Sequence, residues 1–341
     1  MRITKEEMKD TFVKILSAYG FSPFDAEASA EIFVQNSLDG VYSHGVNRFT
    51  RVLAYIDKGY ISPQAHPSVE GSFGSIERWD GNLGMGNLNA QKAMDRAIVL
   101  AKEFGVGCVA MRNTNHWMRG GTYGWQAADA GCIGLCFTNT LPNMPPWGAK
   151  EPKIGNNPLI LAIPWENGHH VVVDTAMAQF SYGKMEEAKL RGESLPFPGG
   201  FDTEGNLSTD PAAIEESLRV LPIGYWKGSS LAIAFDLIAA VLSGGNSTSA
   251  IGKQSEAEFA ISQVFIAIDP YHLTTKEDAE QILDQALNDL KLAEPIEEGE
   301  TVYYPGERTY QTRIENTNNG IPVNEAVWKE ILDHLEKTNQ K

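Results

Sequence analysis

The feature that most constrains the fold of this 341-residue chain is an alternation of strands and helices that begins at about residue 75. Helical patterns are found at 87–104 and 231–242. Strand-like apolar runs are found at 106–111, 133–138, 159–163, 170–174 and 263–269. Such alternation with β-branched runs predicts an α/β fold in which helices cover a mixed sheet. The stretch at 192–211 is rich in Gly, Pro, Asp and Asn, and predicts a long surface loop.

The N-terminal part of the chain has helical patterns only. Thr4 and Glu7 form a capping box, Ser22 and Pro23 are typical of a second helix start, and a third helix is expected from about Asn47. Residues 41–46 form the turn before that third helix. We expect a helical N-terminal region at 1–74 that packs with the C-terminal segment 301–341, and an α/β core at 75–300.

Composition restricts the partners and the compartment. The formal net charge of -16 repels phosphate backbones and anionic membrane surfaces, so we expect neither nucleic acid nor a membrane as partner. No apolar run reaches the roughly 20 residues of a bilayer span, and the N-terminus lacks the apolar core of a signal peptide. Cys108, Cys132 and Cys136 have apolar surroundings, which predicts reduced thiols in the cytoplasm and no metal site.

The usual glycine fingerprint of a dinucleotide enzyme is incomplete. Gly84 and Gly86 precede a helix, but Asn89 stands where the third glycine is required. An ordinary turn before a helix has the same pattern. A dinucleotide would therefore have to be held by other segments, and the core is predicted to be non-Rossmann.

The turn around His44 carries the first candidate chemistry. Arg48 follows four residues later, and Ser43 precedes the histidine directly. An arginine can bind a carboxylate through two hydrogen bonds while an imidazolium donates a proton to a forming alkoxide, which is what keto-acid reduction requires. A histidine that caps a turn beside a solvated arginine has the same local pattern, so the turn alone leaves both interpretations open.

Further candidates follow predicted strands, where α/β sheets place their sites. His116 comes after the strand that ends near Met111, and Thr140 follows the strand at 133–138. Asp174 ends its strand, where a carboxylate can accept both ribose hydroxyls and repel a 2′-phosphate. A histidine bonded to loop carbonyls and an aspartate that caps a helix are the structural alternatives. His169 and His170 are adjacent, and adjacent side chains rarely chelate one ion.

Taken together, several long segments show that the chain resembles the malate/L-lactate dehydrogenase-like family of NAD(P)-dependent oxidoreductases. The resemblance covers nearly the whole chain and rests on residues 40–49, 115–121, 123–127, 144–150, 180–183, 224–228 and 261–268. It implies an L-sulfolactate dehydrogenase-like fold whose α/β core binds the cofactor without the glycine fingerprint. It also implies a homodimer with the active site near the subunit interface.

The resemblance also implies roles for individual residues. His44 matches the proton donor and His116 an acid/base of related members, while Ser43, Arg48 and Thr140 would bind substrate. The cofactor segments match His170, Val171, Val172, Val173, Asp174, Thr175 and Ala176, Trp226 and Lys227, and Gly306, Glu307 and Arg308. Asp174 at the ribose would favour NADH over NADPH.

The expected reaction is hydride transfer from NADH to the C2 carbonyl of a sugar-derived 2-keto acid, with 2,3-diketo-L-gulonate as substrate and 3-keto-L-gulonate as product. Another 2-hydroxy or 2-keto acid is the alternative within the class: malate, lactate, ureidoglycolate or a cyclic imino acid. A non-catalytic sugar-acid binding protein and a metal-dependent hydrolase that uses His169 and His170 are the alternatives outside it.

Overall fold

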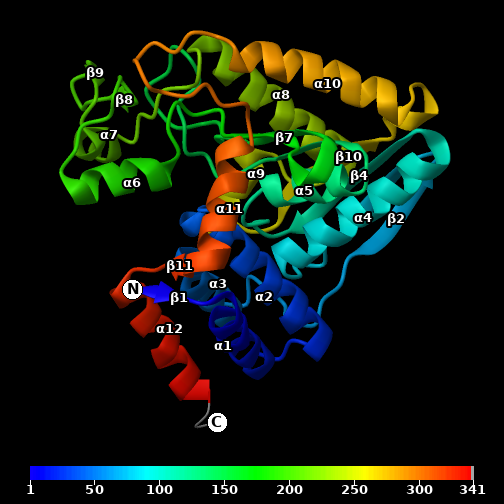
Figure 1. Cartoon of the computed structure of the whole chain (residues 1–341). Helices are drawn as coiled ribbons and strands as arrows, with labels where there is room; N and C mark the ends of the chain where they lie inside the picture. Colours follow the sequence, from blue (N-terminus) through cyan, green and yellow to red (C-terminus); the bar gives the residue numbers. More distant parts are fainter. Residues whose placement is uncertain (339–341) are drawn as a thin grey trace.

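Seven strands form the central sheet of the computed structural model, which describes residues 1–338 (Figure 1). In spatial order they are β2 (Ser68–Phe73), β3 (Ile76–Asp80), β4 (Val106–Thr114), β10 (Ile261–Ile268), β5 (Ile133–Thr138), β6 (Leu159–Ile163) and β7 (Val171–Thr175). β3 and β4 are parallel, and the other neighbours are antiparallel. The predicted mixed sheet is therefore confirmed.

Helices cover both faces of this sheet, because successive strand residues point to opposite sides. On β4, Val109 and Met111 pack with α4 (Gly86–Phe104) and with Tyr123 of α5 (Gly121–Asp129). Cys108 and Ala110 point the other way and join a core with Ala239 of α8 (Trp226–Ser243). The central strands β4 and β10 are buried on both sides, as their continuous apolar runs predict.

A helical region lies at one side of the sheet and contains both chain ends (Figure 1). Its elements are α1 (Lys5–Ala18), α2 (Pro23–Leu38), α3 (Phe49–Asp57), α11 (Glu307–Asn319) and α12 (Glu325–Thr338). β1 (Arg2–Ile3) pairs with β11 (Ile321–Pro322), and Trp328 of α12 is buried in the same core as Phe12 and Phe33. Thr4 and Ser22 cap α1 and α2 with their hydroxyl oxygens.

The division of the chain at residue 74 stays a prediction. β2 lies before that position, yet it pairs with β3 in the main sheet. The expected loop at 192–211 also contains structure, since β8 (Gly200–Phe201) and β9 (Leu207–Ser208) pair within it. This hairpin packs beside α6 (Tyr182–Arg191) and α7 (Pro211–Ser217), while α9 (Thr248–Gln254) and α10 (Lys276–Lys291) complete the fold.

Candidate active site

The segment that carries His44 is a pair of short 3-10 turns between α2 and α3, at Tyr42–His44 and Val46–Arg48. Arg48 therefore precedes α3, which begins later than the sequence predicts. Side chains of α2 fix the turns: Asn36 Nδ2 donates to the His44 carbonyl at 3.0 Å, and the Val46 N–H donates to Ser37 Oγ at 2.9 Å. A Cβ at Gly45 would lie 2.3 Å from Ser37 Oγ, so only glycine allows this approach.

The segment that carries His116 begins where β4 ends. Asn115 Nδ2 donates to the carbonyl oxygens of Tyr60, Leu83 and Gly84, at 3.1, 3.1 and 2.9 Å. These bonds hold the backbone directly before the histidine. The Met118 N–H then donates to His116 Nδ1 at 3.0 Å. Because that nitrogen accepts, the neutral ring carries its proton on Nε2.

The structure brings the two predicted histidines together. The rings of His44 and His116 are stacked, with centroids 5.5 Å apart and an interplanar angle of 12°. His44 Nδ1 lies 3.1 Å from Ser43 Oγ. Its Nε2 has no hydrogen-bond partner among residues 1–338, whereas Nε2 of His116 faces Glu258 Oε1 at 3.9 Å. His44 therefore has a free ring nitrogen, and His116 has a neighbour at each of its nitrogens.

Cations surround the two rings. Burial, followed by the charges of Arg48 and Arg119, lowers the pKa of His44 to about 4. Burial, followed by Arg48, also lowers the pKa of His116 well below its ordinary value. Arg48 and His116 line one small cavity together with Arg51, Val52, Tyr55, Ile61, Asn115 and Met118. Arg48 and Arg51 are both among the lining residues, so two cationic side chains lie beside this small, mainly apolar cavity.

Thr140 lies on the other side of Glu258. Its N–H donates to Asn157 Oδ1 at 3.0 Å, and its hydroxyl donates to Asn156 Oδ1 at 3.2 Å. The next residue, Leu141, donates its N–H to Glu258 Oε2 at 3.2 Å. Thr140 thus belongs to an amide network that reaches His116 through Glu258. Glu258 was missed in the sequence because it stands in a short polar segment before β10.

A buried ion cluster lies beside the His44 segment. The Asp39 carboxylate accepts hydrogen bonds from Arg119 and from Arg313, whose Nε and Nη2 lie 2.6 and 3.0 Å from its two oxygens. Burial raises the pKa of Asp39, but the two arginines outweigh it and hold the pKa below the ordinary value. Arg119 Nε also lies 3.7 Å from Asp174 Oδ2. Arg119 lies within the motif 115–121, but its role was not predicted.

Two of the three predicted cofactor segments lie side by side. The Val172 N–H donates to the Pro305 carbonyl at 2.9 Å, which joins β7 to the turn before α11. Gly306 has a φ of 98°, and a Cβ there would lie 2.9 Å from the His170 carbonyl oxygen. At the end of β7, the Gly121 N–H donates to Asp174 Oδ2 at 2.8 Å. Glycine at 121 therefore allows the backbone to approach Asp174 closely, and glycine at 306 allows the close approach to His170 and Val172.

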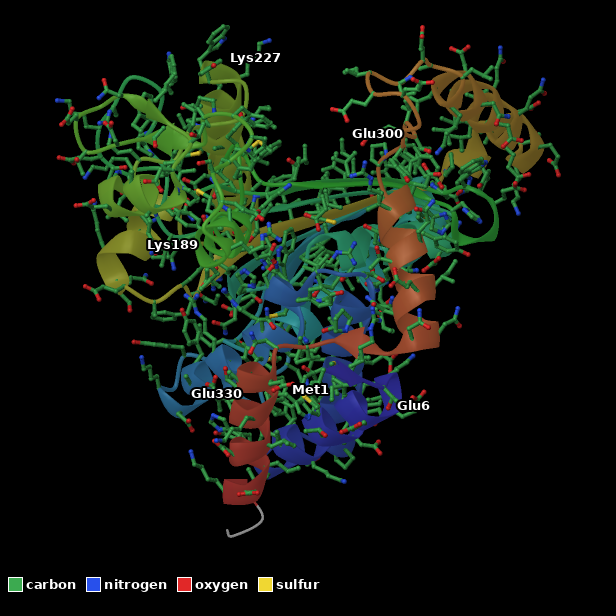
Figure 2. The ribbon with its side chains drawn as sticks, turned by 60° about the vertical axis from the view of Figure 1, so that its left-hand side comes forward. Met1, Glu6, Lys189, Lys227, Glu300 and Glu330 are labelled. Atoms are coloured by element: carbon green, nitrogen blue, oxygen red, sulfur yellow. The ribbon has the colours of Figure 1, made fainter. Side chains whose placement is uncertain are left out.

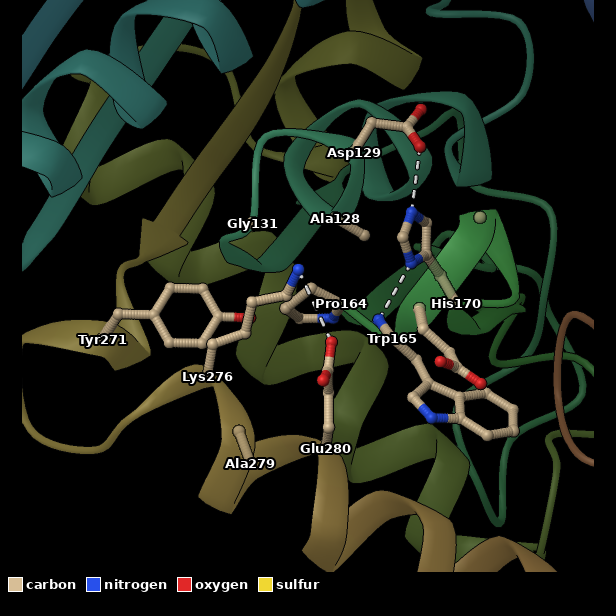
Figure 3. Close-up of a pocket in the computed structure, with 12 residues that line it drawn as sticks. Ala128, Asp129, Gly131, Pro164, Trp165, His170, Tyr271, Lys276, Ala279 and Glu280 are labelled. Atoms are coloured by element: carbon tan, nitrogen blue, oxygen red, sulfur yellow. Dashed lines mark hydrogen bonds and ion pairs between the residues drawn. The ribbon is translucent and has the colours of Figure 1, made fainter.

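The side chain of His170 does not face this region. It lines a separate cavity, where Nδ1 accepts from the Trp165 N–H and Nε2 lies 2.9 Å from Asp129 Oδ1 (Figure 3). Both ring nitrogens are thus used within the fold, so at the cofactor segments His170 can contribute only through its backbone. No group of three or more His, Cys, Asp or Glu side chains suited to a metal occurs in the described part of the chain.

The third cofactor segment begins α8. Trp226 is exposed, and the Lys227 ammonium lies 5.8 Å from its ring centroid. Figure 2 shows Lys227 and Glu300 at the end of the molecule opposite Met1 and Glu330. In the turn before α11 and its first residues, the Lys291 ammonium donates a hydrogen bond to Glu307 Oε1 at 2.5 Å. The Arg308 guanidinium lies 4.4 Å from the Tyr303 ring centroid.

Comparisons with known proteins agree over nearly the whole chain. The sequence model of a family described as malate/L-lactate dehydrogenase matches residues 3–332. The chain is 46% identical to a 2,3-diketo-L-gulonate reductase of Citrobacter koseri over 331 residues, which are 97% of this chain and 99% of that protein.

Solved structures give the same agreement at the level of the fold. The sulfolactate dehydrogenase from Methanocaldococcus jannaschii is 30% identical with a TM-score of 0.91, over 99% of this chain and 98% of that one. The malate dehydrogenase from Entamoeba histolytica is 24% identical with a TM-score of 0.94, over the same shares of the two chains, which shows a shared fold. The resemblance inferred from the sequence segments is confirmed.

Proposed function

Because this chain belongs to the malate/L-lactate dehydrogenase family, we propose that it uses NADH to reduce the C2 carbonyl of 2,3-diketo-L-gulonate to 3-keto-L-gulonate. The full-length identity to a reductase of that name supports the substrate. The single observation that carries the chemistry is the stacked pair His44 and His116 beside Arg48. It combines a proton donor with a cation for the substrate carboxylate.

His44 is the proton donor in this proposal. Ser43 lies at hydrogen-bond distance from Nδ1, and Nε2 is the ring nitrogen left for the substrate. As an imidazolium, His44 donates its Nδ1 proton to the Ser43 hydroxyl oxygen and has its Nε2 proton left for the forming alkoxide, after which the ring is neutral. Met118 and Glu258 occupy the two sides of His116, which makes that ring the less suitable donor.

Arg48 binds the substrate carboxylate in this proposal. The two Nη groups of a guanidinium match the two oxygens of a carboxylate, and the binding is strong where water is excluded. Burial, followed by Arg51, lowers the pKa of Arg48, and an incoming anion would relieve the repulsion between these two cations. The hydroxyl groups of Thr140 and Ser43 would form hydrogen bonds with the remaining oxygens of the sugar acid.

NADH supplies the hydride when it is bound. The described residues fit its ribose, because the Asp174 side chain is 31% exposed and only its Oδ2 has a partner among residues 1–338, which leaves Oδ1 for a hydroxyl. A carboxylate in this place repels a 2′-phosphate, which favours NADH over NADPH. The backbone from His170 to Ala176, the pair Trp226 and Lys227, and the turn of Gly306, Glu307 and Arg308 would hold the rest of the cofactor.

A homodimer is part of the proposal. The helix α8 is the one described helix that is long and apolar enough to cross a membrane by length and composition alone, and 28% of it is buried. Exposed apolar side chains occupy its outer surface: Leu231, Ile233, Leu237, Ile238, Val241 and Leu242. An apolar surface of this kind marks an interface, and we infer that a second copy covers it.

The three free, buried cysteines suit an enzyme of the cytoplasm.

The test is NADH oxidation by the purified protein over a panel of 2-keto acids. 2,3-Diketo-L-gulonate should give the highest kcat/KM, above pyruvate, oxaloacetate and a cyclic imino acid. Oxidation of NADH with another panel member but not with 2,3-diketo-L-gulonate would contradict the substrate. Binding of the sugar acid without any oxidation of NADH or NADPH would contradict the reaction.

A further inference from the structure

Glu258 is a buried carboxylate at the centre of the site, and the reaction as proposed gives it no task. It is 9% exposed and belongs to the segment before β10. Its N–H donates to the Tyr55 hydroxyl at 3.4 Å, and the next ring, that of Phe259, stacks on Tyr60 with centroids 4.6 Å apart. These contacts to α3 and the residues after it fix the backbone, so the position of the carboxylate is built into the fold.

The two oxygens of Glu258 face two different donors. Oε2 accepts from the Leu141 N–H at 3.2 Å, and Oε1 faces His116 Nε2 at 3.9 Å. Because Met118 N–H occupies His116 Nδ1, the proton of the neutral ring is on Nε2, directed toward Glu258. We propose, on the basis of the function proposed above, that Glu258 is a positioning residue that orients His116, and through the stacked rings orients the proton donor His44.

Glu258 also balances the charge of the site. The groups that face the two histidines and Glu258 are the cations Arg48, Arg51 and Arg119, with the phenol of Tyr55 alongside. Burial raises the pKa of Glu258, and Arg48 and Arg51 oppose that rise. Loss of the carboxylate charge would leave Arg48 and Arg51 opposed only by the substrate. Substrate would then bind at least as well, while the histidines would be harder to protonate.

The decisive variant is Glu258→Gln, because glutamine keeps the volume and loses one acceptor. An amide oxygen can accept from Leu141 N–H or from His116 Nε2–H, but the amide NH₂ then meets the other donor. We expect kcat to fall on the order of tenfold or more, with KM for the keto acid unchanged or lower. The kcat should also decline at lower pH than in the wild type, because the donor loses its proton more easily.

Glu256→Gln is the matched control, since Glu256 is exposed two residues away, and it should keep wild-type kcat, KM and pH profile. Glu258→Asp retains the charge but shortens the side chain, so we expect its pH profile to stay near that of the wild type while kcat is reduced. This second variant decides the matter if Glu258→Gln does not fold. Wild-type kcat in either Glu258 variant would overturn the proposal, and so would a higher KM with unchanged kcat.

These measurements use whichever 2-keto acid the wild-type enzyme reduces best. Failure of 2,3-diketo-L-gulonate as a substrate would therefore refute the proposed function in its substrate only. Failure of the Glu258 variants to change kcat would refute the positioning role only. The substrate result comes from the wild-type protein and the positioning result comes from the Glu258 variants. Each failure can therefore be assigned to its own proposal.

Discussion

Burial and neighbouring cations keep His44 neutral at neutral pH while no substrate is bound. Its pKa is lowered to about 4 by burial and by Arg48 and Arg119. A bound keto-acid carboxylate cancels the charge of Arg48, so the pKa of His44 should rise in the complex. In the proposed mechanism, carboxylate binding at Arg48 and protonation of His44 would thus be coupled, because the proton would be taken up when the substrate binds.

The two histidines should differ in their effect on catalysis. His44→Asn removes the ring whose Nε2 has no partner in the described structure, and we expect kcat to fall by about 10²–10⁴-fold. His116→Asn removes a ring held by Met118 and Glu258 and should cause a smaller loss. Steady-state NADH oxidation measures both, and fluorescence titration with NADH should show unchanged cofactor binding. A larger fall of kcat in His116→Asn than in His44→Asn would identify His116 as the proton donor instead.

At the scale of elements, Asp39 joins three parts of the chain. It ends α2, and its carboxylate binds Arg119, which precedes α5, and Arg313 of α11. The Arg313 guanidinium also lies 4.3 Å from the Trp125 ring centroid, within α5. The His44 turn begins at Tyr42, three residues after Asp39. The position of that turn is therefore tied both to α11 and, through Arg119, to Asp174 of β7.

Asp39→Asn should strongly destabilise the protein. Two arginines would lose their counter-charge in a buried place, and breaking such a pair costs about 3–5 kcal/mol of unfolding free energy. Asp10→Asn is the control, since Asp10 is an exposed residue of α1. Urea unfolding at neutral pH measures both variants.

Acid should reduce the difference between Asp39→Asn and the wild type. The folded-state pKa of Asp39 is lowered, so its contribution is present above the ordinary aspartate pKa and is lost as pH falls through the folded value. If the unfolding free energies of Asp39→Asn and the wild type differ by less than about 0.5 kcal/mol at neutral pH, the cluster of Asp39, Arg119 and Arg313 does not stabilise the protein.

The elements show what the sequence could and could not reveal. Apolar runs and caps predicted most strands and the starts of α1 and α2, because those signals are local. The paired strands β8 and β9 were missed, since two residues each give no periodicity. His44 and His116 were found by type and position, but their stacking and the contact with Glu258 depend on the meeting of segments far apart in the chain. Arg119, Asp39 and Arg313 were missed for the same reason.

At the scale of the whole molecule, the outer surface of α8 differs from the rest. The chain carries a formal net charge of -16, yet no charged residue stands between Trp226 and Ser243 except Lys227 and Asp236. The helix covers the face of the sheet opposite α4 and α5, and its inner side packs through Ala239. The start of the same helix carries the proposed cofactor residues Trp226 and Lys227, so a partner on α8 would also lie near that site.

The proposed dimer should therefore depend on α8. Val241 is 77% exposed, and Val241→Asp places a charge where a second copy would pack, so it should convert a dimer to a monomer without unfolding the chain. Val99→Asp is the control, because Val99 is 52% exposed on α4, at the opposite face of the sheet. Sedimentation equilibrium gives the mass of each protein. If both variants remain dimers, the interface lies elsewhere; if the wild type is a monomer, the exposed surface of α8 requires a different partner. Loss of NADH binding together with the dimer in Val241→Asp would place the cofactor site beside the interface, because α8 is the element that the two would share.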